Sequence, residues 1–269
     1  MLQYRPMVAE PRYIDTHAHL CAAQFAEDRA AALDRAAAAG VHRVFEIGYD
    51  LPSSRAAVAL AARHPQVWAV VGIQPHYAST TTGADLNELR ALAAAPRVVA
   101  IGECGLDYFH DRAPHDAQEA LFRRQLALAR ELHLPVVIHS RDAGADTIRI
   151  LDSAARGQPG IMHSFSGDWA YAAACIEIGF HLSLSGPVTF RNASALHDVA
   201  RRAPIERLLS ETDSPYLAPH PLRGKRNEPA NIPLIVAQIA TLRGITVAAA
   251  AAALWHNAAQ LFRLAEEDM

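Results

Sequence analysis

Two histidines, one residue apart, end a short apolar stretch near the start of the chain. The stretch covers residues 13–19 and reads YIDTHAH. On a β-strand, residues i and i+2 point to the same face, so His17 and His19 would project together where the strand stops. Two neutral imidazoles aimed at one point are typical of a metal site.

Further histidines and carboxylates stand at the ends of other apolar runs. They are Glu103 after 98–102, His139 after 135–138, His163 after 160–162 and Asp213 shortly after 207–211. Such groups are costly to bury unless they are paired or bound to metal. The whole set suits two divalent ions better than one structural zinc. Either Glu103 or Asp213 would then bridge two ions about 4 Å apart, as in two-metal hydrolases.

These residues occupy equivalent places in an alternating pattern of short and long segments. The short runs predict buried parallel strands at 13–17, 43–47, 67–73, 98–103, 136–139, 160–163, 180–184 and 207–211. Helical spacing predicts helices at 27–39, 53–63, 85–94, 115–133, 145–155, 169–178, 192–202, 230–242 and 247–264. The pattern predicts an α/β fold, a (β/α)8 TIM barrel, in which the C-terminal ends of the strands meet at one mouth.

The chain is expected to form one domain. Its 269 residues suit a single barrel over 13–269, preceded by an N-terminal extension at 1–12. A doubly wound open sheet is the alternative fold. No Gly-x-Gly-x-x-Gly motif follows the first predicted strand, which argues against the dinucleotide-binding form of that sheet.

Composition limits the classes of partner. The chain is 51% hydrophobic and has a net charge of -3, so it has material for a large core and no global basic field for nucleic acid or membranes. A polyanion would have to be held by local arginines or by metal. The three cysteines form no C-x-x-C pair, and no signal peptide or 18-residue apolar stretch is found. We therefore expect a cytoplasmic monomer that does not enter a membrane.

Six motifs in order carry a family resemblance. They are DTHAH at 15–19, GECGLDY at 102–108, IHSR at 138–141, HSFSG at 163–167, ETDSP at 211–215 and RGKRNEP at 223–229. Together they resemble the TatD family of metal-dependent hydrolases, from about residue 13 to Phe262. The resemblance implies a barrel of the amidohydrolase superfamily with two divalent ions and DNase activity.

The resemblance also implies a ligand set for each ion. One ion would be held by His17, His19, Glu103 and Asp213, and the other by Glu103, His139 and His163. Glu103 would then be the bridge between them. Such histidine and carboxylate sites accept Zn, Mn, Mg, Co or Ni, so the sequence leaves the identity of the metal open.

One departure from the family pattern concerns proton transfer. The family usually has Gly-x-His-Pro after the third strand, whereas residues 72–76 read GIQPH. Gln74 can form hydrogen bonds but cannot titrate near neutral pH. His76 lies two residues further on and is expected to contact the substrate in its place.

The expected reaction is metal-assisted hydrolysis of a phosphodiester, with DNA ends or single-stranded DNA as the substrate. Asp213 would act as general base toward a metal-bound water, and Glu103 would be the second catalytic group. Basic residues near the mouth would bind phosphates or, alternatively, form surface salt bridges. They are Arg141, Arg223, Lys225 and Arg226.

Two other functions remain open at this stage. The same metals could hydrolyse a small ester, lactone or amide, because a fold does not determine its substrate. A binding or scaffold protein with an idle metal site is the third hypothesis. Competition by single-stranded DNA, and turnover on a broad substrate panel, would separate the three.

Overall fold

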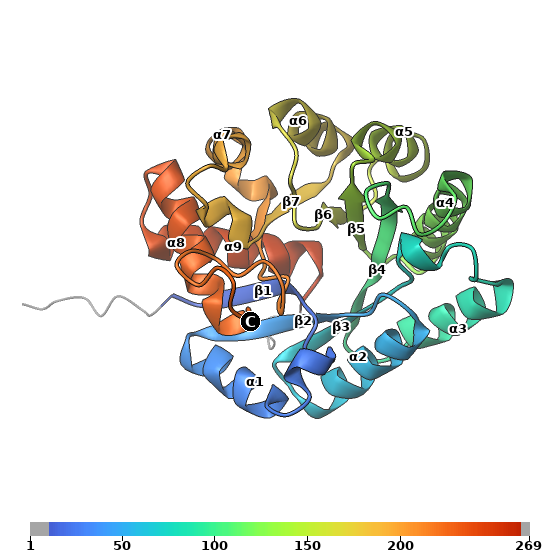
Figure 1. The fold of residues 1–269 in the computed structure, drawn as a ribbon, viewed down its shortest axis with the longest axis horizontal. Coiled ribbons are helices and arrows are strands. Elements are labelled where there is room, and N and C mark those ends of the chain that lie inside the picture. Colours follow the sequence, from blue (N-terminus) through green and yellow to red (C-terminus); the bar gives the residue numbers. More distant parts are fainter. Residues whose placement is uncertain (1–10, 265–269) are drawn as a thin grey trace, which may run out of the picture.

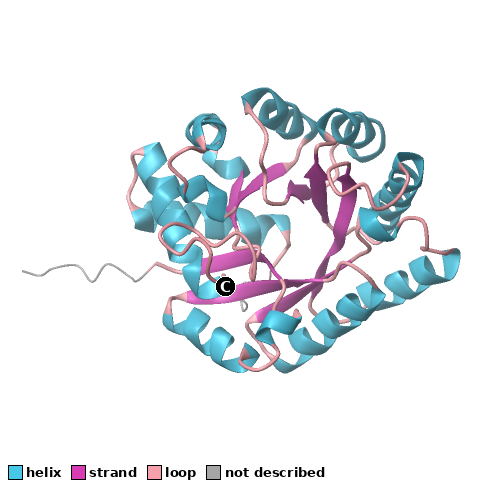
Figure 2. Cartoon of the chain, in the orientation of Figure 1, coloured by secondary structure: helices cyan, strands magenta, loops and turns pink. Residues whose placement is uncertain are grey.

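The computed structural model describes residues 11–264, so residues 1–10 of the expected N-terminal extension lie outside the described part. Within it, eight parallel strands form one sheet in chain order. They are β1 (Tyr13–Ala18), β2 (Val41–Ile47), β3 (Val67–Val71), β4 (Val98–Asp107), β5 (Val136–Arg141), β6 (Gly160–Met162), β7 (His181–Leu184) and β8 (Leu208–Ser210). Figures 1 and 2 show these strands as a ring with helices around it.

Helices follow the strands as the sequence predicts. They are α1 (Arg29–Ala38), α2 (Leu51–Arg63), α3 (Gly83–Ala93), α4 (His115–Glu131), α5 (Gly144–Ala155), α6 (Trp169–Ile178), α7 (Ser194–Arg202), α8 (Ile232–Arg243) and α9 (Val247–Leu261). Short 3-10 helices lie between them: η1 (Ala23–Phe25), η2 (Pro75–Tyr77), η3 (Gly186–Thr189), η4 (Ile205–Arg207) and η5 (Pro229–Asn231). The predicted (β/α)8 barrel is confirmed, with small shifts at most element ends. The exception is β4, which continues past Glu103 to Asp107.

Backbone contacts after β8 join the two ends of the sheet. Ala18 forms a parallel bridge with Ser214. The His19 amide donates to the Ser214 carbonyl at 2.7 Å, and the Asp213 amide donates to the His17 carbonyl at 2.9 Å. The ring therefore closes beside the His-x-His motif.

Local sequence signals explain where several helices begin and end. Asp50 and Ser53 form a capping box at the start of α2, and the Thr246 side chain accepts from the Ala249 amide at the start of α9. Gly179 ends α6 with a φ of 117°, a backbone conformation that favours glycine. These ends fix how abruptly the chain turns back into the next strand.

The core has two layers. The outer layer fills the space between the strands and the surrounding helices. The inner layer joins side chains inside the strand ring, such as Phe45 and Val70, to Trp255 and Phe262 at the C-terminal end of the chain. The rings of Phe45 and Phe262 pack edge to face, with centroids 4.6 Å apart. This inner layer closes the bottom of the barrel, opposite the mouth.

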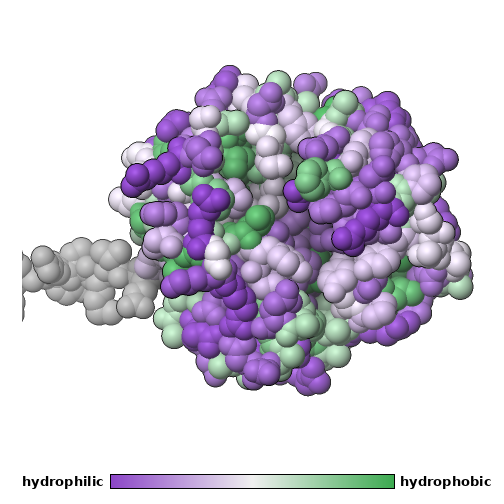
Figure 3. All heavy atoms as spheres, viewed as in Figure 1, coloured by the Kyte–Doolittle hydropathy of each residue, from purple (hydrophilic) through white to green (hydrophobic). Residues whose placement is uncertain are grey.

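Large apolar side chains are sparse on the surface. The exposed ones in residues 11–264 are Tyr77, Phe109, Tyr216, Leu217, Leu234, Ile245 and Val247. Figure 3 shows the apolar residues on one face as separate patches among hydrophilic ones. No single described helix is long and apolar enough to cross a membrane, although Pro229–Arg243 and Val247–Leu261 pass that test as a pair bent by 109°.

Candidate metal centre

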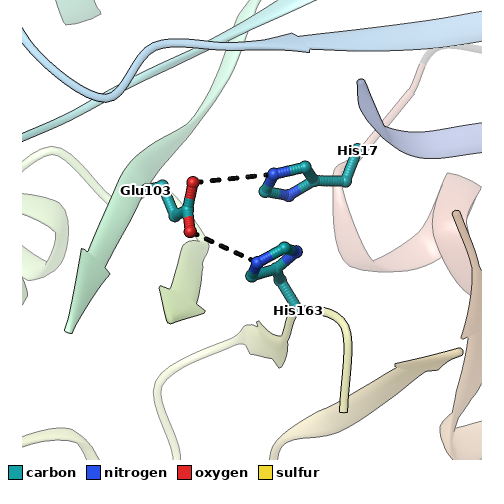
Figure 4. Close-up of side chains that lie close together, drawn as sticks. All are labelled: His17, Glu103 and His163. Carbon is teal, nitrogen blue, oxygen red and sulfur yellow. Dashed lines mark ion pairs between the residues drawn. The ribbon is translucent and has the colours of Figure 1, made fainter. Parts of the chain in front are cut away.

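Glu103 lies at the centre of the predicted ligands. Its Oε2 atom is 3.6 Å from Nε2 of His17. Its Oε1 atom is 2.8 Å from Nδ1 of His139 and 3.2 Å from Nε2 of His163. Figure 4 shows the two oxygens of Glu103 directed toward the rings of His17 and His163. The two oxygens of one carboxylate thus face different histidines.

Asp213 completes a second group beside the first. Its Oδ1 atom is 3.5 Å from Nε2 of His19 and 3.7 Å from Nε2 of His17. The two Nε2 atoms are themselves 3.2 Å apart. His17 therefore takes part in both groups, and the structure brings all six predicted ligands together at the mouth.

Backbone features hold these side chains at the strand ends. The Asp15 carboxylate accepts from the Thr212 amide at 2.9 Å and from the Thr212 hydroxyl at 2.5 Å, which ties β1 to the segment that carries Asp213. Asp213 itself has a φ of 54°, which is uncommon for a residue other than glycine. Gly105 has a φ of 142°, and a Cβ there would lie 1.9 Å from the His139 carbonyl oxygen. Glycine therefore allows β4 to approach β5 closely beside His139.

Three of the four histidines have an acceptor on the ring nitrogen that faces away from the centre. Nδ1 of His19 is 3.2 Å from the Ile47 carbonyl. Nδ1 of His163 is 2.9 Å from Oε1 of Glu211, and Nε2 of His139 is 3.1 Å from Oδ2 of Asp107. Since a neutral imidazole carries one N–H, donation to these acceptors leaves a lone pair on the nitrogen that faces the centre. This is the tautomer that a metal requires.

The electrostatics of the buried groups also fit a cation. Burial raises the pKa of the Glu103 carboxyl, but His163 and His139 outweigh it and hold the pKa well below its usual range. Burial and the neighbouring His163 lower the pKa of His17 well below its usual value, so His17 is neutral. Burial lowers the pKa of His139, but Asp107 and Glu103, whose Oε1 lies 2.8 Å from Nδ1, outweigh it and raise the pKa above its usual value. One ionised carboxylate with several imidazoles around it, and Asp213 beside them, fits a divalent cation.

Gln74 stands where the family usually has histidine, and it forms a hydrogen bond within the site. Gln74 donates from Nε2 to Oε2 of Glu103 at 2.8 Å. His76 lies further along, and its Nε2 contacts Oδ2 of Asp107 at 3.0 Å. Gln74 thus orients the Glu103 carboxylate.

The predicted phosphate-binding residues differ in their surroundings. Arg141 is exposed and lies over the ring of Phe109, at 4.2 Å from the centroid. Arg223 lies in the same way over Phe190, at 4.3 Å, and Lys225 is exposed. These three cations are open to solvent.

Arg226 is engaged within the protein. Its guanidinium donates to both carboxylate oxygens of Asp28, at 2.7 and 2.8 Å, and to the Gln24 carbonyl at 2.7 Å. It also lies over the ring of Phe25. These contacts match the salt-bridge alternative for Arg226, and substrate binding by it stays a prediction.

Two carboxylates of the site were not among the predicted residues. Asp107 and Glu211 have fully buried side chains, and each accepts from a histidine of the centre. Asp107 has the same strand parity as Glu103, so a longer β4 would have pointed to it. Glu211 contacts His163 across 48 positions of sequence, which no local pattern encodes.

Comparisons with known proteins agree with this geometry. Residues 14–263 match the family described as TatD related DNase. The chain is 43% identical to the uncharacterized metal-dependent hydrolase YabD of Bacillus subtilis over 251 residues, 93% of this chain and 98% of YabD. It is 38% identical to the 3'-5' ssDNA/RNA exonuclease TatD of Klebsiella pneumoniae over 236 residues, 86% of this chain and 90% of that protein.

A solved structure gives the same picture. The TatD homologue YJJV of Escherichia coli superposes with a TM-score of 0.90 at 31% identity, over 95% of this chain and 99% of YJJV. The shared barrel and the match over nearly the whole described chain account for the six motifs in order. This chain is a metal-dependent hydrolase and belongs to the family of TatD related DNases.

Proposed function

We propose that this enzyme hydrolyses phosphodiester bonds at the 3' end of single-stranded nucleic acid with two divalent ions. Glu103 carries the argument, because one of its oxygens faces His17 and the other faces His139 and His163. One ion would be held by His17, His19, Asp213 and Glu103, and the other by Glu103, His139 and His163.

The bound ions would polarise a phosphate oxygen and lower the pKa of an attacking water. Asp213 accepts the proton of that water, since its side chain is 14% exposed and its Oδ1 faces His17 and His19. Glu103 keeps the two groups of ligands together, and Gln74 fixes the orientation of Glu103.

The rim of the mouth supports a single strand as substrate. Phe109 is 58% exposed after β4, Tyr216 is 52% exposed after β8, and Tyr77 is exposed in η2. Unpaired bases stack on such rings. The guanidinium groups of Arg141 and Arg223 are exposed, so they would bind the phosphates of a strand whose bases stack on these rings. The Klebsiella relative is named an exonuclease of ssDNA and RNA, which agrees with this substrate class.

An exonuclease assay on end-labelled single-stranded DNA tests the proposal. The protein is stripped with chelator and reloaded separately with Mg, Mn and Zn. We expect at least one ion to restore a ladder from the 3' end, and Asp213→Asn to abolish it. Asp198→Asn is the matched control, because Asp198 is half-exposed on α7 and pairs with Arg202. If the metal-loaded protein leaves the DNA strand intact with every ion, the proposed nuclease activity is wrong.

A small ester, lactone or amide is the second candidate substrate. Gln74 favours it, because the amide supplies no titrating group at the place where the family usually has histidine. Turnover of a chromogenic phosphodiester distinguishes the two. Single-stranded DNA should inhibit that turnover if it is the substrate, and should have no effect if the site takes small molecules.

The setting in which the enzyme works is also part of the proposal. Cys104 and Cys175 are buried free thiols, and Cys21 is free and partly buried, which fits a reducing compartment such as the cytoplasm. The barrel also closes its own sheet, so we expect a monomer. Light scattering after gel filtration would check this against the chain mass of 29.1 kDa.

A further inference from the structure

A second cluster of ligating side chains lies beside the metal centre. Oδ2 of Asp107 is 3.0 Å from Nε2 of His76, 2.8 Å from Nδ1 of His110 and 3.1 Å from Nε2 of His139. Asp107 ends β4 and is fully buried, whereas the side chains of His76 and His110 are 16% and 36% exposed. Three imidazoles thus surround a single carboxylate oxygen.

Hydrogen bonds alone do not satisfy this arrangement. A carboxylate oxygen has two lone pairs. The other oxygen of Asp107, Oδ1, already accepts from the His110 amide at 2.8 Å. His139 uses one lone pair of Oδ2, because its Nε2 donates there when its Nδ1 faces Glu103. One lone pair is left for His76 and His110 together.

The geometry points to a third divalent-cation site, formed by Nε2 of His76, Nδ1 of His110 and Oδ2 of Asp107. A cation on the remaining lone pair of Oδ2 would accept the lone pairs of both imidazoles, so every group has a partner. These ligand atoms all lie within 4.8 Å of one another. Two imidazoles and one carboxylate suit a borderline ion such as Zn, Co or Ni.

The site adjoins the centre that holds the six predicted ligands, because Asp107 also contacts His139, but its own ligands are different residues. His76, Asp107 and His110 are not among those six, and the rings of His76 and His139 are 6.4 Å apart. The exposed side of His110 leaves room for a water or a phosphate oxygen as a further ligand, since sites with three protein ligands keep an open position. We call these three residues the rim site.

Metal stoichiometry tests the rim site without reference to activity. The metal-free chain and its variants are dialysed at a series of free Zn concentrations, and bound metal is measured by mass spectrometry. We expect His110→Asn to bind one ion per chain fewer than the unmodified protein, however many ions the main centre holds. His76→Asn should lose the same ion. The difference does not depend on the substrate, so failure of the nuclease assay leaves it unaffected.

His115→Asn is the matched control. His115 stacks on Tyr108 and pairs with Asp111, and it contacts none of the three rim ligands. This variant should bind as many ions as the unmodified chain, and circular dichroism should show all the variants folded. Equal zinc binding by His110→Asn and the unmodified protein at every concentration would overturn the rim site, as would an equal loss in His115→Asn.

Discussion

At the bottom of the barrel, the inner side chains of the strands meet apolar residues of the chain's C-terminal end, whereas at the mouth the strand ends carry histidines and carboxylates. Phe45 and Phe262 represent the bottom, where packing needs only shape and apolar surface. Glu103 and His163 represent the mouth, where each buried charged or polar group needs a hydrogen-bonding or oppositely charged partner. Changes at the bottom should therefore alter stability, and changes at the mouth should alter metal binding and catalysis.

The largest effect is expected from Glu103→Gln. Its carboxylate faces histidines from three different strand ends. Without its negative charge, both proposed metal sites lose a shared ligand. Hydrolysis should fall about 10³-fold or more, with loss of bound metal. Metal content and turnover on labelled DNA measure this. Glu88→Gln, a partly exposed partner of Arg55, is the control and should behave like the unmodified protein. Full activity in Glu103→Gln would contradict the proposal that Glu103 is a ligand shared by both metal ions.

Phe45→Ala should lower stability without changing metal binding. The Phe45 ring is fully buried against Phe262, and its removal should lower the free energy of unfolding by about 3–5 kcal/mol. Urea unfolding measures the loss. Phe45→Leu, which keeps part of the volume, should lose less. Bound metal per folded chain should stay the same in both variants, and a parallel loss of metal would show that bottom and mouth are not independent.

The difference between the two ends also explains what the sequence could predict. His139 and His163 stand at the ends of apolar runs, so a local pattern was enough to place them at the mouth. Asp107 is not among the predicted site residues, because Gly105 interrupts the apolar run and the predicted strand ends at Glu103, whereas β4 continues to Asp107. Close approach of β4 to β5 is what extends the strand there, and that depends on tertiary packing.

Partners that are distant in sequence were beyond prediction for the same reason. Glu211, after β8, meets His163, after β6, across the end of β7. Arg226 meets Asp28 because the barrel closes and brings the loop after β8 beside the segment that follows β1. A single sequence gives residue types and periodicity, but not which distant charges will be neighbours. The ligand types were therefore predictable, whereas the groups that orient or neutralise them were not.

A smaller effect is expected from Glu211→Gln. The Glu211 carboxylate accepts from Nδ1 of His163 at 2.9 Å and from the Ser164 amide at 2.7 Å, and so orients a predicted ligand. Loss of its charge should lower metal affinity about 10-fold or more, because such outer partners tune the ligand. Competition with a chelating dye measures the affinity. Glu206→Gln, an identical change at an exposed position, should leave it unaltered. Equal affinities would mean that His163 is oriented without Glu211.

The change that is smallest near neutral pH concerns the bottom of the barrel. His181 is the first residue of β7, and burial, with the nearby Arg207, lowers its pKa to about 4. A histidine in the unfolded chain titrates near 6.5, so between these values the unfolded state binds a proton that the folded state does not. Its contribution to stability is complete above pH 6.5 and is lost as the pH falls toward 4.

The pH profile of urea unfolding, compared between the unmodified protein and His181→Gln, isolates this contribution. The variant lacks the titrating ring, so its free energy of unfolding should fall less steeply between pH 6.5 and 4, by at most about 1.4 kcal/mol per pH unit. The histidines of the mouth titrate in both proteins and cancel in the comparison. Parallel profiles would show that His181 is protonated in the folded state, and that the bottom of the barrel, like the mouth, accommodates a charge.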